Sequence, residues 1–366
     1  MAYTVLALET SCDENAGAVV VDGRTIRSSV VASQVAVHAR YGGVVPELAG
    51  REHLRSLAAV LESTLGEAGC EWGDLDAVAV TQGPGLGGSL LVGVNAAKAI
   101  AWARELPCVP VHHIEGHIYA NWLEPAVEPY GGEPPPFPLV CLVVSGGHSE
   151  LLLMEGHGVL TRLGGTLDDA AGEAFDKVAR LLGLPFPGGP PIERAAAGAT
   201  SASGAGAARL PRARLPGTLD FSFSGLKTAV RQRLREEPEA EVGALARAFQ
   251  ESVVDALVTK TVEAAAAHGA RAVLAAGGVA ANGALRASLE ERCGSGLGLE
   301  VRVPPAGLCT DNAAMVGAAA FYRRGTPEGT MGEAAAGSGA LGFDVFSTAR
   351  TLGGARSLGL PRETSD

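Results

Sequence analysis

Short apolar segments that end in glycine- or acid-containing turns recur along this 366-residue chain. The four turns read ETSCDEN (Glu9 to Asn15), VSGGHSE (Val144 to Glu150), DDAAGEAFDK (Asp168 to Lys177) and GGVAAN (Gly277 to Asn282). Glycine lets backbone N–H groups in such turns approach a phosphate closely. The repeated order of strand, turn and helix predicts an α/β fold with parallel crossover units.

The second half of the chain resembles the first. Leu139–Val144, like Thr4–Leu8, is an apolar segment that ends in a small polar turn and then resumes as a strand. Aligning Leu6 with Leu142 places Glu9 on Ser145. Two unrelated α/β hairpins share such features, so chance similarity stays open beside duplication. Duplication predicts two domains of one topology on either side of a cleft.

Length and composition favour two domains, with 47% hydrophobic and 19% charged residues. We expect an N-terminal domain over residues 1–123, a linker over 124–138, a C-terminal domain over 139–345 with a basic insertion near 198–218, and a tail over 346–366. No apolar run is long enough for a membrane span, and the N-terminus lacks signal-peptide features. The six cysteines form no C-x-x-C pair, which favours reduced thiols and a cytoplasmic protein.

Two amphipathic or apolar segments predict helices in the first domain. After Pro46, the side chains Leu54, Leu57, Leu61 and Leu65 repeat at helical spacing. A second helix is expected over residues 90–104. Both helices are candidates for contact with a partner or a second copy of the chain, with packing in the core as the alternative.

The sequence HHIEGH places His113 and His117 four residues apart, so a helix would bring both imidazoles to one face. Glu115 lies on a different face, unlike the glutamate of the zinc-peptidase motif H-E-x-x-H. A pair of capping or core histidines remains the alternative. If a metal is bound, Asp311 in CTDNAAM is the best third ligand, and two imidazoles with one carboxylate suit Fe²⁺ or Zn²⁺.

Acids and bases cluster at two other places. Asp169, Glu173 and Asp176 would share a helix face, where they need a cation or hydroxyl donors; an exposed acidic helix is the alternative. The densest positive cluster comprises Arg209, Arg212, Arg214, Arg231, Arg233 and Arg235. The net charge of −11 argues against nucleic-acid binding by the whole surface, but it permits a local phosphate contact. A solvated loop and helix face is the other interpretation.

Taken together, the motifs resemble the bacterial TsaD family of tRNA threonylcarbamoyladenosine synthases over about residues 4 to 345. The resemblance rests on LALETSCDE, YGGVVPELAGREH, VTQGPGLGGSLLVG, HIEGH, LVVSGGHSEL, DDAAGEAFDKVARLLGL, PGGP, FSFSGLKTAV, FQESVVD, GGVAAN and CTDNAAM. It implies two duplicated RNase H-like domains of the actin/Hsp70/sugar-kinase superfamily with a central cleft. The basic insertion and the tail depart from the family pattern.

The resemblance also implies roles for individual residues. It makes His113, His117 and Asp311 the metal ligands, and it gives Glu9 and Asp13 a secondary catalytic role. It assigns the nucleotide to Val143, Val144, Ser145, Gly146, Gly147, Asp176, Gly189, Glu193 and Asn282. The family more often has Asp at the position of Glu193.

The implied reaction transfers L-threonylcarbamoyl from threonylcarbamoyl-AMP to N6 of adenosine 37 in tRNAs that read codons beginning with A. The implied cofactor is one divalent transition metal per chain, Fe²⁺ first and Zn²⁺ second. The implied partners are tRNA, a TsaB-like paralogue and a TsaE-like P-loop ATPase, with self-association when the paralogue is absent. A metallopeptidase, a small-molecule kinase of the same fold and a non-enzymatic nucleotide switch remain the alternatives.

Overall fold

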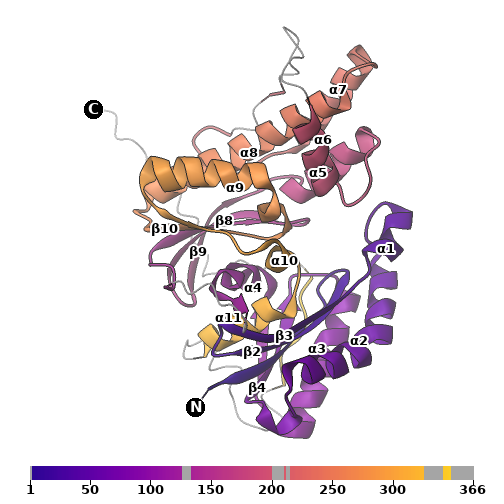
Figure 1. The fold of residues 1–366 in the computed structure, drawn as a ribbon, viewed down its shortest axis with the longest axis vertical. Coiled ribbons are helices and arrows are strands. Elements are labelled where there is room, and N and C mark those ends of the chain that lie inside the picture. Colours follow the sequence, from indigo (N-terminus) through magenta and orange to yellow (C-terminus); the bar gives the residue numbers. More distant parts are fainter. Residues whose placement is uncertain (1, 126–132, 200–209, 212–214, 325–340, 348–366) are drawn as a thin grey trace. The chain divides into compact units, whose positions relative to one another are not determined.

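The computed structural model describes residues 2–125, 133–199, 210–211, 215–324 and 341–347. The chain divides into two compact units (Figure 1). Unit 1 combines Met1–Pro134 with Thr310–Leu352, and unit 2 contains Pro135–Cys309. Among the described residues, no helix has both the length and the apolar character needed to cross a membrane. All six cysteine thiols are free.

Unit 1 is built on a six-stranded sheet in the order β5-β4-β1-β2-β3-β6. Its strands are β1 (Thr4–Glu9), β2 (Glu14–Val21), β3 (Thr25–Ser33), β4 (Ala77–Gly83), β5 (Cys108–His112) and β6 (Glu124–Pro125). Its helices are α1 (Val35–His38), α2 (Pro46–Ala68), α3 (Gly87–Arg104), α4 (His113–Tyr119) and α11 (Ala313–Arg323). Leu6 of β1 packs in an apolar cluster with side chains of α2, and Leu8 packs in another with side chains of α3. Ala7 lies on the other face of the sheet, against α11. Alternation along β1 therefore gives the sheet two covered faces.

Unit 2 is built on a five-stranded sheet in the order β11-β10-β7-β8-β9. Its strands are β7 (Leu139–Val144), β8 (Ser149–Gly156), β9 (Val159–Gly165), β10 (Ala272–Ala276) and β11 (Glu300–Arg302). Its helices are α5 (Ala171–Leu181), α6 (Gly189–Gly198), α7 (Ser224–Glu236), α8 (Val242–Ala267), α9 (Gly283–Leu289) and α10 (Ala306–Cys309). The side chains of α5, α6 and α8 share one apolar core with β7 and β8.

The two sheets have the same topology, as the duplication hypothesis predicts. In unit 1, β1 pairs antiparallel with β2 and parallel with β4. In unit 2, β7 pairs antiparallel with β8 and parallel with β10. The outer strands β5 and β11 extend the parallel side of each sheet, and β6 is an addition to unit 1.

The expected domain boundary at residue 345 is wrong, because the chain returns to unit 1 after residue 309. Helix α11 packs against β1, β2 and α4. Gly317 makes this packing possible, since a Cβ there would lie 2.8 Å from Cγ2 of Val20. Most of the basic insertion, with Arg209, Arg212 and Arg214, lies outside the described residues, as do residues 348–366 of the tail.

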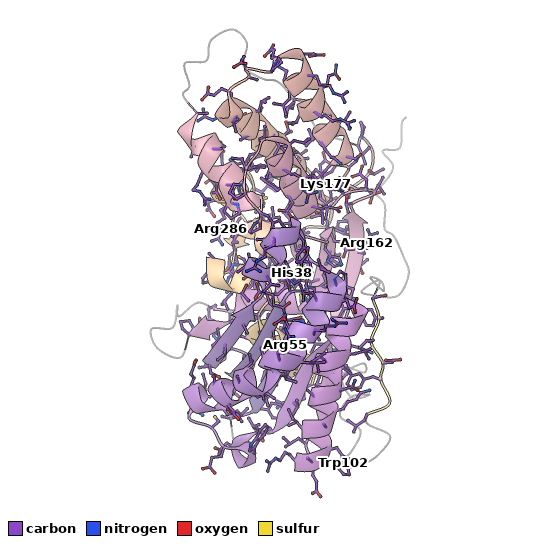
Figure 2. The ribbon with its side chains drawn as sticks, turned by 90° about the vertical axis from the view of Figure 1, so that its right-hand side faces the viewer. His38, Arg55, Trp102, Arg162, Lys177 and Arg286 are labelled. Carbon is purple, nitrogen blue, oxygen red and sulfur yellow. The ribbon has the colours of Figure 1, made fainter. Side chains whose placement is uncertain are left out.

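The leucine repeat of α2 predicts the helix but not its buried face. Leu54 is 67% exposed, whereas the polar side chains of His53 and Thr64 are fully buried. Gly17 of β2 leaves room for Thr64, whose hydroxyl also donates to the carbonyl of Val60 at 2.7 Å. Trp102, near the end of α3, is 76% exposed and projects from the surface (Figure 2).

A chain of hydrogen bonds through two buried histidines holds the ETSCDEN turn. The N–H of Val45 donates to Nδ1 of His38 at 3.2 Å, and Nε2 of His38 donates to the side-chain Oε1 atom of Gln34 at 3.1 Å. The Gln34 amide donates to Nδ1 of His53 at 2.9 Å, and Nε2 of His53 donates to the Cys12 carbonyl at 3.0 Å. Each ring accepts one bond and donates one, so both imidazoles are neutral.

Burial lowers the pKa of His53, so the unfolded chain takes up a proton near pH 6.5 before the folded protein does. We therefore expect the contribution of His53 to stability to be complete above pH 6.5 and to be lost as the pH falls. His53→Gln keeps one donor and one acceptor but cannot titrate. The melting temperature of this variant, measured from pH 5 to 8, should fall less on the acid side than that of the wild type.

The isosteric change Gln34→Glu should reverse this dependence, because a carboxylate cannot donate to Nδ1 of His53. The variant should lose about 1–3 kcal/mol at neutral pH and recover stability as His53 becomes protonated on the acid side. Parallel melting curves of wild type and Gln34→Glu over this pH range would contradict the proposed direction of the hydrogen bonds.

Candidate active site

The two histidines of the HIEGH motif lie one turn apart on α4, as the spacing predicts. The helix begins at His113, directly after β5 ends at His112. The ring of His112 caps the helix by accepting the N–H of Ile114 at 3.3 Å. The ring centroids of His113 and His117 are 4.6 Å apart, and both side chains are buried.

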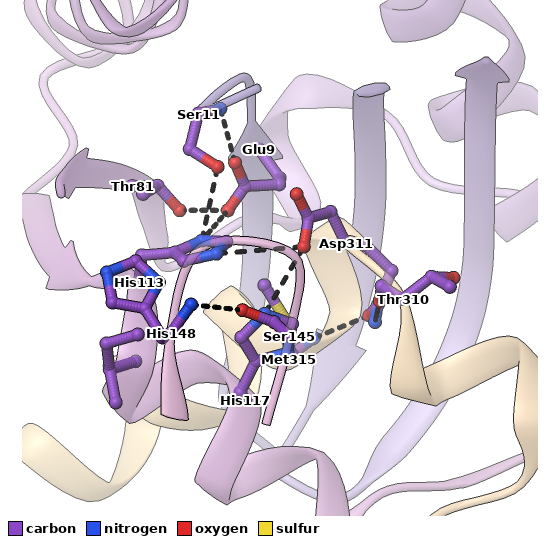
Figure 3. Close-up of polar contacts among 12 residues, drawn as sticks. Glu9, Ser11, Thr81, His113, His117, Ser145, His148, Thr310, Asp311 and Met315 are labelled. Atoms are coloured by element: carbon purple, nitrogen blue, oxygen red, sulfur yellow. Dashed lines mark hydrogen bonds and ion pairs between the residues drawn. The ribbon is translucent and has the colours of Figure 1, made fainter. Parts of the chain in front are cut away.

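Asp311 completes this cluster from a distant part of the sequence (Figure 3). Its Oδ1 atom lies 3.2 Å from Nε2 of His117 and 3.6 Å from Nε2 of His113. The next residue, Asn312, caps α11 by accepting the N–H of Met315 at 2.9 Å. Helix α11 can approach α4 closely because Gly116 has no side chain in the path of Met315.

The donor set fits a metal ion. One atom from each of His113, His117 and Asp311 lies within 4.8 Å of the others. Both ring nitrogens of His117 are buried without a hydrogen-bond partner, because the approach to Asp311 lacks hydrogen-bond geometry. A buried imidazole without a partner costs free energy that a metal ligand bond would offset. Two imidazoles and one carboxylate leave coordination positions open.

Glu9 supports the ring of His113 from the side opposite Asp311. Its Oε2 atom lies 3.2 Å from Nδ1 of His113 and also accepts the Thr81 hydroxyl, while Oε1 accepts the N–H of Ser11. Burial opposes ionisation of Glu9, but the charge of His113 and its hydrogen bond outweigh burial and lower the pKa of Glu9. Burial likewise opposes protonation of His113, yet the carboxylates of Asp311 and Glu9 raise its pKa to about 9.

Glu9 is fully buried behind His113, and its secondary catalytic role stays a prediction. Asp13 is partly exposed, and its carboxylate lies beside the thiol of Cys12. Ser11 and Thr81 were not among the predicted site residues, although both contact the Glu9–His113 pair. Ser11 lies in the ETSCDEN motif and Thr81 in VTQGPG, so their places in these motifs could have identified both as site residues.

The GPGLGGS segment fixes the same turn from another direction. The N–H of Leu86 donates to the Ser11 carbonyl at 2.7 Å. A Cβ at Gly85 would lie 2.5 Å from that carbonyl oxygen, so only glycine allows this approach. Gly85 therefore serves packing against ETSCDEN, whereas a Cβ at Gly87 or Gly88 would meet no described atom within 4 Å.

In unit 2, three of the predicted turns meet at Ser145. The N–H of Gly172 donates to the Ser145 carbonyl at 3.1 Å, and a Cβ at Gly172 would collide with it. Gly277, at φ +90°, lies against the carbonyl of Val144. Gly146 and Gly147 are exposed, and a Cβ at either would meet no described atom within 4 Å. The side chain of Val143 is buried, so only backbone there can reach a ligand.

The polar residues predicted to bind the nucleotide have partners within unit 2. Asp176 accepts the N–H of Gly188 at 2.6 Å, next to Gly189. Glu193 accepts the N–H of Gly283 at 2.7 Å. Asn282 caps α9 through the N–H of Leu285 at 3.0 Å and donates to Gln250 at 2.9 Å. These contacts shape the turns, and the binding roles of the residues stay predictions.

The acids of DDAAGEAFDK do not share one helix face as expected, because α5 begins only at Ala171 and Asp169 precedes it. Lys177 bridges Asp169 at 2.6 Å and Glu173 at 2.7 Å. Asp168 instead accepts the hydroxyls and N–H groups at the start of α7, from Ser222, Phe223 and Ser224. Groups of the chain itself thus balance these carboxylates.

Comparison with known proteins places the chain among curated relatives. It is 51% identical over 319 residues to the tRNA N6-adenosine threonylcarbamoyltransferase of Dehalococcoides mccartyi (strain CBDB1), covering 87% of this chain and 93% of the relative. It is 55% identical over 320 residues to the enzyme of the same name from Geobacillus thermodenitrificans, covering 86% and 90%.

Solved structures with low sequence identity share the fold. HypF of T. kodakarensis matches with a TM-score of 0.58 at 15% identity, over 87% of this chain and 47% of that one. Component A of the Acidaminococcus fermentans (R)-2-hydroxyglutaryl-CoA dehydratase matches with a TM-score of 0.51 at 14% identity, over 88% and 98%. The chain shares its mixed α/β fold with these proteins, and its two sheets of one topology agree with the expected actin/Hsp70/sugar-kinase fold.

The family model that matches the chain is described as TsaD, tRNA N6-adenosine threonylcarbamoyltransferase, and it covers residues 25–318. This range includes α4, with both histidines, and Asp311. The match covers most of the chain and agrees with the identities of the curated relatives. The chain therefore belongs to the TsaD family of tRNA N6-adenosine threonylcarbamoyltransferases.

Proposed function

We propose that the protein transfers L-threonylcarbamoyl from threonylcarbamoyl-AMP to N6 of adenosine 37 in tRNAs that read codons beginning with A. The single observation that carries this proposal, beside family membership, is the cluster of His113, His117 and Asp311, in which the buried ring of His117 lacks a hydrogen-bond partner. In the reaction, N6 forms a bond to the carbamoyl carbon, the bond from that carbon to the phosphate oxygen breaks, and AMP leaves. The amine loses one proton.

His113, His117 and Asp311 would hold one divalent metal per chain, and we propose Fe²⁺ as the native ion with Zn²⁺ as the alternative. When bound, such an ion supplies Lewis acidity to an oxygen of the substrate. Glu9 keeps Nδ1 of His113 occupied, which leaves Nε2 as the ligand atom. Because adenine N6 is a weak nucleophile, positioning must supply much of the acceleration. We propose that Asp13, whose side chain is partly exposed, accepts the proton that N6 loses.

We propose that the exposed backbone at Gly146 and Gly147 binds the phosphate of the adenylate, close to Ser145. Asp176, Gly189, Glu193 and Asn282 remain proposed contacts of its nucleoside. Their present hydrogen bonds hold the turns in which they lie.

The protein partners and the cytoplasmic location are further parts of the proposal. The family resemblance supports a TsaB-like paralogue and a TsaE-like ATPase. Leu54 on α2 and Leu91 and Trp102 on α3 are exposed apolar side chains. They support a helical contact with the paralogue, or with a second copy of the chain when the paralogue is absent.

Two alternatives find less support in unit 1. A metallopeptidase needs a free carboxylate as base, but Glu115 is buried and forms an ion pair with Arg323 of α11 at 2.9 Å. A kinase of this fold would hold Mg²⁺ through carboxylates, whereas the cluster contains two imidazoles.

The direct test is to incubate the protein with threonylcarbamoyl-AMP, the partner proteins and unmodified tRNA, and to analyse the nucleosides by mass spectrometry. Formation of threonylcarbamoyladenosine supports the proposal. Peptide cleavage or Mg²⁺-dependent ATP turnover, without the modified nucleoside, would favour an alternative.

Removing a ligand should remove the metal. In His117→Ala or Asp311→Asn we expect metal content to fall from about one ion per chain to near zero, and product formation to be lost, with the fold retained. Metal analysis and circular dichroism provide the measurements. The control is His268→Ala, because Nε2 of His268 is also buried without a partner but lies in unit 2. Full metal content in His117→Ala would exclude this site.

Removing the charge of Glu9 should weaken the metal site without removing it. We expect Glu9→Gln to lower metal affinity about 10- to 100-fold, because a neutral amide holds His113 less firmly. Competition with a chelator measures the affinity. Glu150→Gln, which removes a partly buried carboxylate paired with Arg162 in unit 2, should leave the affinity unchanged. An unchanged affinity in Glu9→Gln would mean that Glu9 does not orient His113.

The Glu115–Arg323 pair should act in stability rather than as a catalytic base. We expect Glu115→Gln alone to cost about 1–3 kcal/mol of the free energy of unfolding, because the partly buried Arg323 loses its charged neighbour on α4. The double variant Glu115→Gln/Arg323→Gln should recover most of this loss and retain transfer activity. Denaturant unfolding and the nucleoside assay measure both effects. A double variant that is stable but inactive would indicate that Glu115 takes part in the reaction.

A further inference from the structure

Helix α7 presents one basic face to solvent. Its buried side chains are Leu226 and Val230. At about 100° per residue, Lys227, Arg231 and Arg235 form a row that runs from the flank of this buried face to the opposite side of the helix. Arg231 and Arg235 are exposed and Lys227 is partly exposed. We call these three residues the basic stripe.

No described acid neutralises the basic stripe. Among the ion pairs that the structure describes, none includes Lys227, Arg231 or Arg235, and the acids near the end of α7 have other partners. Glu237 pairs with Arg233 at 3.0 Å, and Glu236 accepts the side-chain amide of Gln232 at 2.8 Å. Asp168, at the start of the helix, is occupied by the hydroxyls of Ser222 and Ser224.

The stripe brings the helix no evident stability. Lys227–Arg231 and Arg231–Arg235 are like-charge pairs at i,i+4, which destabilise a helix. The helix dipole disfavours Lys227 in the first turn of α7 and favours Arg235 in the last turn, so it gives the stripe no clear net stabilisation. The protein as a whole carries a net charge of −11. Three unopposed cations on one face of an acidic protein therefore indicate an anionic ligand.

We propose that the basic stripe binds the phosphate backbone of the tRNA substrate. This inference rests on the proposed function, which supplies a polyanion as the substrate. Residues four apart on a helix are separated by about 6 Å along its axis, so the stripe extends over about 12 Å. It can thus meet more than one phosphate of a strand. Such contacts hold and orient the tRNA without reading its bases.

The test is direct binding of fluorescently labelled, unmodified tRNA to the full-length protein between 50 and 200 mM salt. The variant Lys227→Gln/Arg231→Gln/Arg235→Gln should bind about 10- to 100-fold more weakly at the lowest salt. Its slope of log affinity against log salt should be smaller by about 2.7, from three phosphate contacts at about 0.9 each. The matched control Arg51→Gln/Arg55→Gln/Arg302→Gln removes three cations that are already paired with acids.

Absence of tRNA binding by the wild type at 50 mM salt, or an equal loss in both triple variants, would overturn the proposal. Kinetics separate it from the proposed function. In the transfer reaction, the stripe variant should raise KM for tRNA about tenfold and leave kcat and the KM for threonylcarbamoyl-AMP unchanged. Equal KM values for tRNA would again overturn the proposal. If the wild type binds tRNA through the stripe but forms no product, only the proposed function fails.

Discussion

The approach of Asp311 to the two imidazoles of α4 is the contact on which the rest of the site depends. Burial of His113 and His117 is unfavourable unless their polar atoms find partners. For His113 those partners are carboxylates on both sides, which raise its pKa to about 9. A ring that holds a proton between two carboxylates already marks a place where positive charge is stabilised. The same electrostatic environment suits a divalent cation, which would also give Nε2 of His117 a bonding partner.

The HIEGH motif is spaced for packing against α11 as much as for metal binding. Glu115 points away from the two imidazoles and forms its ion pair with Arg323 at the far end of α11. Gly116 lets the start of α11 come close to α4. The residues between the ligands therefore fix the helix that follows Asp311. This explains why the motif superficially resembles that of a peptidase and yet differs in the position of the glutamate.

Local pattern was sufficient for much of the fold and for the placement of His113 and His117 one turn apart on α4. The bounds expected for Leu139–Val144 are those observed, since buried strands read as continuous apolar runs. The buried face of α2 could not be read in this way, because His53 is buried by hydrogen bonds to Gln34 and Cys12 rather than by hydrophobicity. Such partners become neighbours only through tertiary structure, and periodicity does not contain that information.

The acids of unit 2 show the same limit of prediction from local sequence patterns. The sequence places Asp176 and Glu193 beside glycine turns, which is the pattern of ligand contacts, but in the structure each accepts a backbone N–H of such a turn. A carboxylate that holds the turn fixes the backbone before any ligand arrives, and a preformed turn loses less conformational entropy on binding. The turn at Gly146 and Gly147, where we propose that the phosphate binds, is closed instead by the N–H of Ser145, which donates to the His148 carbonyl at 2.8 Å. The acids can therefore be essential to nucleotide binding without touching the nucleotide.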